Sequence, residues 1–180
     1  MKIKPAGSGV VVELGTREPG LPGRSDASPF SIQKILVPVD FSDCSRKALR
    51  YAIPFAKQFG ASLTLLFVTQ INYAVGEFGV IDSPLMEAQV REAAEKAMDK
   101  LLLEEVGEVV PATKQTRIGR PATEIAAAAK ELDVDLIIIS THGHTGIKHV
   151  LLGSVTENVA RLAPCPVLVV REEEHEFLRG

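Results

Sequence analysis

The C-terminal third of the chain carries glycines, hydroxyls and histidines in an order that suits phosphate binding. Residues 140–146 read Ser-Thr-His-Gly-His-Thr-Gly, and residues 153–156 read Gly-Ser-Val-Thr. Glycine lets backbone amides approach an anion because it has no Cβ, and amides at a helix start carry partial positive charge. The competing interpretation is that these glycines only form turns. Neither a Walker A pattern nor G-x-G-x-x-G after a strand occurs, which argues against a P-loop or an ordinary dinucleotide site.

Three histidines, His142, His144 and His149, gather in the same segment and raise the question of a metal site. No cysteine or carboxylate near them in sequence completes a tetrahedral ligand set. Contact with phosphate, or plain exposure, is therefore the favoured interpretation.

Asp40 is a second candidate, because it directly follows the apolar run 34–39. An aspartate here could cap the helix that begins a few residues later. A role of Asp40 as a phosphoacceptor is disfavoured, because such a site requires a pair of acidic residues after the strand. Phe41 follows Asp40 instead. Cys44 falls in the first turn of the same predicted helix, and an ordinary free thiol is the favoured interpretation. The alternative is that the helix dipole lowers the pKa of this thiol.

Regular elements must position these residues, and the spacing of apolar residues predicts which ones. Short apolar runs, typical of strands buried on both faces, predict strands over residues 34–39, 62–68, 136–140 and 166–170. Residues 113–118 predict a further strand from a weaker pattern. A period near 3.6 predicts helices between them. One ends at Gly60, one has the apolar face Met86, Val90, Ala94, Ala97 and Leu101, one starts at Pro121 and one covers Leu151–Ala163.

Strands that alternate with helices imply right-handed crossovers and an α/β fold, an open parallel sheet with helices on both faces. In such sheets ligands bind beyond the carboxyl ends of the strands, where the winding direction reverses. The loops after the first and fourth predicted strands are therefore the expected site. They hold Asp40 and the glycine-rich segment.

The 180 residues are 46% hydrophobic and 24% charged, which is typical of a globular protein. Residues 31–180 fit one domain, whereas residues 1–30 are rich in glycine and proline and predict a flexible N-terminal extension. Within that extension, Val10–Leu14 has strand propensity and could instead add a strand to a sheet edge.

Charge and cysteine content narrow the setting in which the protein works. A net charge of −3 argues against nucleic acid as a partner. No apolar run reaches the roughly 20 residues that span a bilayer, so a membrane is not expected either. Two cysteines far apart in sequence favour a reduced, cytoplasmic protein.

Taken together, four segments of the chain resemble the universal stress protein family. The glycine pattern of that family is G-x2-G-x9-G-[S/T], and Gly143 followed by Gly153-Ser154 agrees with its later part. The likeness includes residues 34–40, the motif Gly119-Arg120-Pro121 and residues 164–170, so it covers about residues 31–171. Ser140 stands where the pattern has its first glycine. Its Cβ narrows the approach to a ligand, and its hydroxyl could donate a hydrogen bond.

The resemblance implies a Rossmann-like fold with strand order 3-2-1-4-5 and, as in many members, binding of ATP. Carried over by position, it implies a nucleotide site formed by Pro38, Val39, Asp40, Val68, Ser140, His142, Gly143, His144, Gly153, Ser154, Val155 and Thr156. Asp40 would lie near the ribose or a magnesium ion, and Val68 would meet the adenine through its backbone. The residues around Gly143 would surround the phosphates, and residues 153–156 would close over them.

The function expected from this is binding of ATP, ADP or AMP by a regulatory or sensor protein of the stress response. The sequence offers no nucleophile–base pair, so the chain is expected to be at most a slow ATPase. The alternative is a nucleotide-free dimeric interaction module of the same fold. The last strand, Val167–Val170, is apolar and predicts a homodimer through an exposed sheet edge.

Overall fold

The computed structural model describes residues 31–70, 84–141 and 152–172, together with four short strands outside these ranges. Between residues 84 and 141, side chains are described from residue 88 onward. The chain divides into two compact units, Met1–Ser31 and Ile32–Gly180.

The first unit contains a two-stranded antiparallel sheet made of β1 (Lys2–Ala6) and β2 (Gly9–Glu13). The strand expected from the propensity of Val10–Leu14 is therefore present, but its partner is β1 and not an edge of the main sheet. β1 carries two lysines and a proline, a composition that does not predict a strand.

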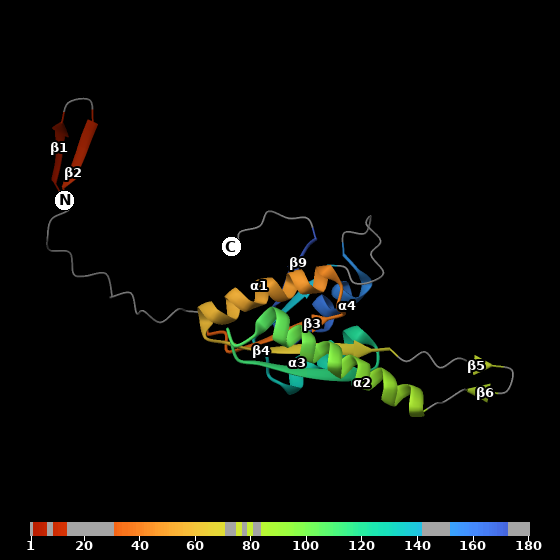
Figure 1. Ribbon diagram of the computed structural model, residues 1–180. Coiled ribbons are helices and arrows are strands. Elements are labelled where there is room, and N and C mark those ends of the chain that lie inside the picture. Colours follow the sequence, from red (N-terminus) through yellow and green to blue (C-terminus); the bar gives the residue numbers. More distant parts are fainter. Residues whose placement is uncertain are drawn as a thin grey trace. The chain divides into compact units, whose positions relative to one another are not determined.

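The second unit is built on a five-stranded parallel sheet, as far as the chain is described. Its strands are β3 (Lys34–Val39), β4 (Ser62–Thr69), β7 (Ala112–Ile118), β8 (Leu136–Ser140) and β9 (Val167–Val170). They lie in the order β7-β4-β3-β8-β9 (Figure 1). In chain order this is 3-2-1-4-5, so the predicted fold class and strand order are confirmed. Two short strands, β5 (Val75–Gly76) and β6 (Gly79–Val80), form a separate antiparallel pair.

The helices are α1 (Asp43–Phe59), α2 (Pro84–Leu101), α3 (Pro121–Glu131) and α4 (Ser154–Leu162), and α2 continues into a π-helical turn, η1 (Leu102–Val106). α1 ends as predicted, with Gly60 in the left-handed conformation at φ 67°. α3 has Pro121 in its first turn, also as predicted. The predicted start of α4 at Leu151 is wrong. The helix begins at Ser154, because the backbone of Gly153 is extended (φ −68°, ψ 149°).

Helices cover both faces of the sheet, and each face has its own hydrophobic core. Along β3, Ile35 and Val37 belong to the core shared with α1 and α2, whereas Leu36 belongs to the core shared with α3 and α4. All three side chains are fully buried, which explains the continuous apolar run in the sequence. On α2, Met98 is fully buried and Ala97 only partly, so the apolar face differs by one residue from the predicted one.

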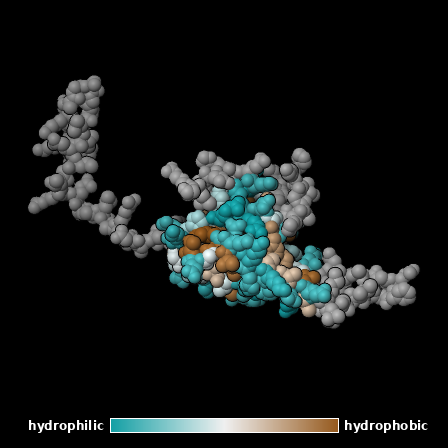
Figure 2. All heavy atoms as spheres, viewed as in Figure 1, coloured by the Kyte–Doolittle hydropathy of each residue, from teal (hydrophilic) through white to brown (hydrophobic). Residues whose placement is uncertain are grey.

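The face of the molecule in Figure 2 is mainly hydrophilic, with hydrophobic residues in small groups between the polar ones. Among the described residues, the most exposed large hydrophobic side chains are Leu103 and Val109, in and just after η1, and Leu162 at the end of α4. Within the described ranges, none of the helices combines the length and the apolar character needed to span a membrane.

Candidate functional site

The sheet reverses its winding direction between β3 and β8. From β3 the chain passes through α1 to β4 on one side, and from β7 it returns through α3 to β8 on the other side of β3. The carboxyl ends of β3 and β8 lead into Asp40 and Thr141. Open α/β sheets bind ligands at such a point, and the candidate site is built from the residues that follow these strands.

The turn after β3 is held by hydrogen bonds among three polar residues. Asp40 Oδ1 accepts hydrogen bonds from the backbone N–H of Ser42 (3.1 Å) and from its hydroxyl (2.6 Å). Ser42 is the N-cap of α1, and its Oγ accepts a hydrogen bond from the N–H of Ser45 over 3.2 Å. The interpretation of Asp40 as the helix cap is therefore wrong. Ser42 caps α1, and Asp40 orients Ser42.

Phe41, between these two residues, has a left-handed backbone with φ 66°, which is unusual for a residue with a Cβ. Its ring packs on Phe67 near the end of β4, with ring centroids 4.8 Å apart and planes inclined by 41°. Both rings are partly buried against the core beneath α1. The sequence holds no signal for this pair, because a left-handed backbone is usually adopted by glycine or asparagine.

β4 extends two residues beyond the end of β3. Val39, the last residue of β3, lies opposite Phe67, whereas β4 continues to Thr69. The carbonyl of Thr69 accepts a hydrogen bond of 3.0 Å from the N–H of Gly119, on the β7 side. Backbone groups of consecutive strand residues face opposite neighbours. The carbonyl of Val68 therefore faces the space above the end of β3.

The motif Gly119-Arg120-Pro121 shapes the turn from β7 into α3. A Cβ at Gly119 would lie 2.8 Å from Oε1 of Glu124, and its φ of 153° also favours glycine. Arg117 fixes the same helix to β7, since its guanidinium donates to Glu131 (2.5 Å) and lies 3.8 Å from Glu124. The glycine thus allows α3 to begin close to the end of β4.

Two hydrogen bonds tie the start of α4 to the end of β8. Thr156 Oγ1 donates to the carbonyl of Ser140 over 2.7 Å, and both residues are buried. The N–H of Gly153 donates to the carbonyl of Thr141 over 2.9 Å. Because the N–H of Thr141 bonds to Val170 on the β9 side, the preceding carbonyl of Ser140 faces β3. The N-terminus of α4 therefore lies at the boundary between β3 and β8.

The structure describes nine of the twelve residues predicted for the nucleotide site; His142, Gly143 and His144, like His149, lie outside the described residues. The nine are near the carboxyl ends of β3, β4 and β8 or at the start of α4. Pro38 and Val39 are buried within the sheet. Ser154 and Val155 are exposed in the first turn of α4, and Thr156 beside them is buried. Their role in binding stays a prediction.

Cys44 lies in the first turn of α1, but its surroundings do not activate the thiol. Burial raises the pKa of Cys44 above its ordinary value, and the carboxylates of Glu172, Asp40 and Asp43 raise it further. The alternative in which the helix dipole lowers this pKa is therefore wrong, and the favoured interpretation of an ordinary free thiol is confirmed. Burial also raises the pKa of Cys165.

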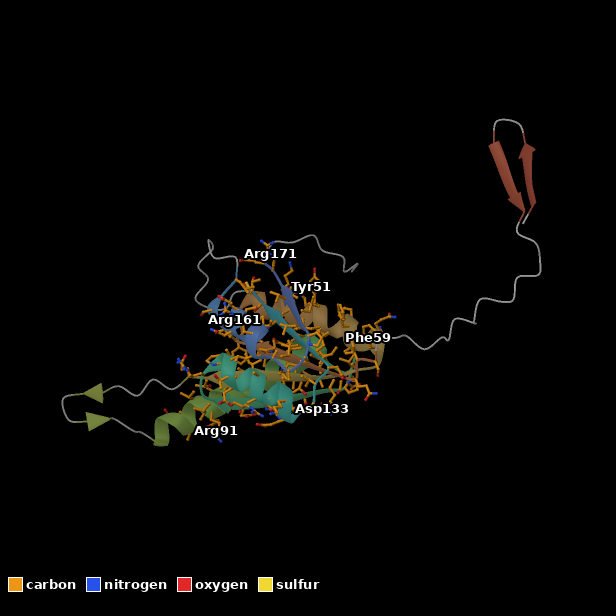
Figure 3. All side chains as sticks on the ribbon, turned by 180° about the vertical axis from the view of Figure 1, so that it is seen from behind. Tyr51, Phe59, Arg91, Asp133, Arg161 and Arg171 are labelled. Carbon is orange, nitrogen blue, oxygen red and sulfur yellow. The ribbon has the colours of Figure 1, made fainter. Side chains whose placement is uncertain are left out.

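A shallow hollow of about 100 Å³ lies on the α2 side of the strand ends. Thr69 and Ile118 line it from β4 and β7, and Val90 and Arg91 line it from α2. Arg91 is labelled in Figure 3. Sequence reasoning missed this feature, because it depends on how α2 packs across two strands. In the described ranges, no three His, Cys, Asp or Glu side chains come together in a way that could hold a metal ion.

Residues 31–171 match the universal stress protein family. Universal stress protein MJ0531 of Methanocaldococcus jannaschii is 36% identical over 146 residues, which is 80% of this chain and 85% of that protein. The solved structure of MJ0577 from the same organism has a TM-score of 0.70 and 32% identity, and the match covers 81% of this chain and 99% of that chain. A universal stress protein solved in complex with cAMP has a TM-score of 0.54 and 25% identity, over 80% of this chain and 100% of that chain.

Proposed function

The chain belongs to the universal stress protein family, and from this premise we propose that it binds an adenine nucleotide at the carboxyl ends of β3, β4 and β8. A family member that is 25% identical to it has been solved with cAMP, an adenine nucleotide. This likeness supports the choice of ligand class. The choice among ATP, ADP and AMP is left to the experiment below.

One observation carries the proposal: the bond between Thr156 and Ser140 holds the N-terminus of α4 at the reversal point of the sheet. The first amides of a helix have no partner within the helix and carry partial positive charge, so they attract phosphate. Ser154 adds an exposed hydroxyl to the same turn, whereas the hydroxyl of Thr156 is buried and donates to Ser140. In the proposed complex the phosphates lie against this turn and the segment around Gly143.

The adenine is proposed to lie above the end of β3, where the carbonyl of Val68 faces. The exocyclic amine of adenine donates hydrogen bonds, so a carbonyl in this place favours adenine over guanine, which carries an acceptor there. Asp40 would face the ribose or a magnesium ion. Mg²⁺ is usually bound by one or two carboxylates of the protein, and its other ligands are phosphates and water. Asp40 could therefore serve as such a carboxylate ligand.

A protein of this kind is proposed to act as a nucleotide-dependent regulator or sensor in the stress response. If ATP is hydrolysed, turnover is expected to be slow, because the residues of the site bind and orient and include no nucleophile with its base. Phosphate contacts and one magnesium ion are a minimal set for hydrolysis.

Mass spectrometry of the natively purified protein tests the proposal most directly. Co-purified ATP, ADP or AMP is the expected result. Thermal unfolding with millimolar ATP, ADP and AMP, each with Mg²⁺, is the companion measurement, because a ligand that binds only the folded state raises the unfolding midpoint. Absence of both a co-purified nucleotide and a midpoint shift would contradict the proposal.

Ser140 favours a second candidate, a nucleotide-free dimeric interaction module. It replaces the first glycine of the family pattern, and it is buried at the end of β8. In this alternative the fold serves to present a sheet edge to a partner, and β9 is the edge strand next to β8. The nucleotide measurements above separate the two candidates, since only the first predicts a bound nucleotide.

A further inference from the structure

We propose that Phe41 is a positioning residue of the nucleotide site. Its left-handed backbone, held by the packing of its ring on Phe67, fixes the direction in which Asp40 faces the ligand. The inference rests on the proposed function and adds a residue that the candidate site does not include.

The backbone of Phe41 needs support from its surroundings. In a left-handed conformation the Cβ of an L-residue crowds the following carbonyl, which makes the conformation unfavourable. Among the described residues other than glycine, only Phe41 (φ 66°) and Asp133 (φ 52°) have it. An aspartate can stabilise the conformation through its short polar side chain. Phenylalanine has no such group, so contacts of its ring and of its neighbours must hold it.

Those contacts are present on three sides of the residue. The ring packs on Phe67 of β4, with a centroid distance of 4.8 Å. Before it, the N–H of Asp40 donates to Ser45 Oγ over 3.4 Å. After it, Ser42 donates to the Asp40 carboxylate and caps α1. A strained residue that its surroundings determine so fully is typical of ligand sites.

The position of the Asp40 carboxylate depends on this turn. Asp40 and Ser42 bond across Phe41, so a change in the backbone angles of Phe41 separates the carboxylate from the cap of α1. The carboxylate then turns away from the place proposed for the ribose or magnesium. Phe41 touches neither group itself and acts through Asp40.

Three substitutions at the same position test the inference by isothermal titration with ATP and Mg²⁺. Phe41→Tyr keeps the ring and should bind within about twofold of the parent, since a tyrosine ring packs as phenylalanine does. Phe41→Gly should bind about fivefold more weakly, because glycine tolerates the left-handed backbone but also samples others. Phe41→Ala should bind at least about fivefold more weakly than Phe41→Gly, because alanine loses the ring and keeps the clash.

The order of the ATP affinities of Phe41→Gly and Phe41→Ala distinguishes a positioning role of Phe41 from a packing role. If Phe41 only fills space, glycine should be the worse substitution, because it removes one more carbon and loosens the chain. The amide of Ser45 donates a hydrogen bond to the N-cap Ser42. Its hydrogen-exchange rate therefore measures the stability of the turn without any nucleotide. Protection of this amide should fall in the order parent, Phe41→Gly, Phe41→Ala.

Two matched controls come from the opposite end of the domain. Asp133→Gly replaces a second non-glycine residue with a left-handed backbone, and Phe55→Leu breaks a second aromatic pair of the described residues, in which the ring centroids of Phe55 and Phe59 are 6.2 Å apart. Figure 3 shows Phe59 and Asp133 at the end of the domain away from Arg91, which lines the hollow beside the carboxyl ends of β4 and β7. Both variants should change the unfolding midpoint and leave ATP affinity unchanged.

Equal affinities of Phe41→Ala and Phe41→Gly, or the reverse order, overturn the inference. If the parent binds no ATP, the proposed function fails, and the exchange order alone then decides whether Phe41 controls the turn. If Phe41→Ala does not fold, Phe67→Leu replaces it, because it removes the ring partner and keeps residue 41. Phe67→Leu should weaken ATP binding about threefold through loss of the aromatic contact, and unchanged affinity overturns the inference.

Discussion

Asp40 combines a contact within the turn with a predicted contact to the ligand. Its Oδ1 accepts two hydrogen bonds from Ser42. Asp40→Asn keeps an oxygen acceptor and removes the charge, so the free energy of unfolding should stay within about 0.5 kcal/mol of the parent. Its affinity for ATP in the presence of Mg²⁺ should fall about tenfold, a typical loss when support of a bound metal is removed.

Titration with and without Mg²⁺ checks this prediction, with Asp40→Ala as the structural comparison. Asp40→Ala should also lose about 1 kcal/mol of stability, because Ser42 loses its acceptor. Denaturant unfolding measures that difference. A loss of affinity in Asp40→Asn that is the same without Mg²⁺ would argue against a metal contact of Asp40.

Gly143 carries the most direct test of the phosphate segment. Binding of ATP stabilises the folded state by about 2.7 kcal/mol when the free nucleotide exceeds its Kd a hundredfold. Gly143→Val should abolish this stabilisation, because a β-branched side chain fills the space proposed for phosphate. Thermal unfolding with ATP and Mg²⁺ is the measurement. An unchanged midpoint shift in Gly143→Val means that the phosphates bind elsewhere.

Ser140 can be tested by restoring the glycine of the family pattern. Its side chain lies on the same face of β8 as Ile138, which packs in the core with α1. We expect Ser140→Gly to bind ATP more tightly, because removal of the Cβ widens the approach. If the hydroxyl donates to a phosphate, the same change should instead weaken binding by about 0.5–1.5 kcal/mol. Isothermal titration decides, and equal affinities would place Ser140 outside the site.

At the scale of elements, charged side chains fasten the edge strand β7 to the helices on both faces. Lys114 Nζ lies 2.8 Å from Glu95 and 2.7 Å from Asp99 of α2. The opposite face of the strand holds Arg117, which pairs with Glu131 of α3. Hydrogen bonds donated by Lys114 and, to a lesser extent, by Thr116 lower the pKa of Glu95 below its ordinary value of 4.5. The hydrogen bond donated by Arg117 likewise lowers the pKa of Glu131.

These shifts predict how the protein responds to acid. A carboxyl group with a lowered pKa in the folded state stabilises the fold above its ordinary value near 4.5 and loses that contribution as the pH falls below it. The double variant Glu95→Gln, Glu131→Gln should therefore be less stable than the parent at pH 7 and should lose less stability on acidification. Denaturant unfolding across this range checks it.

Salt provides the control, because both glutamates are exposed to solvent. At about 1 M salt the Debye length falls to about 3 Å, and the difference between parent and double variant should shrink. A difference that is the same at low and high salt would show that the stability change comes from packing and not from charge.

The strands could be predicted from the sequence because burial on two faces leaves a plain pattern. Leu136–Ser140 is buried throughout, and its observed bounds equal the predicted ones. The start of α4 could not be predicted in the same way. Leu151 and Leu152 continue the apolar spacing of the helix, but the backbone of Gly153 is extended and ends that spacing. Local backbone geometry overrides periodicity at this point.

The candidate site could be predicted as a region of the fold and not as a set of contacts. From the alternation of strands and helices we expect Asp40 and the glycine-rich segment to lie together at the carboxyl ends of the strands. The choice of Ser42 as the cap depends on the left-handed Phe41, which nothing in the sequence indicates. Likewise, the direction of the Val68 carbonyl depends on how far β4 extends past β3.

At the scale of the whole molecule, we predict a homodimer joined by antiparallel pairing of β9 with its copy. β9 is the edge strand beside β8 in the described sheet, and Val167, Leu168 and Val169 are only partly buried. An unpaired apolar edge favours pairing with a second chain, and two-fold symmetry closes the contact. Val169→Lys should yield monomers in sedimentation velocity, with a parent-like circular dichroism spectrum. A monomeric parent at tens of micromolar contradicts the prediction.

The N-terminal segment offers the control for this prediction. β2 pairs with β1 in a sheet of its own. Deletion of residues 1–30 should therefore leave the oligomeric state unchanged. A changed state would instead indicate that this segment takes part in assembly.

The two edges of the sheet differ, and this difference limits how far such association can continue. β9 presents no charged side chain between Val167 and Val170, whereas β7 carries Lys114 and Arg117, each paired with acidic residues of a helix. Charges along an edge strand discourage further strand pairing. Two copies joined through β9 leave the β7 edges as the outer edges of the described five-stranded sheets, so growth through these sheets stops at the pair. Assembly through this sheet is thus self-limiting, and neither filaments nor aggregates should form by edge addition at high protein concentration.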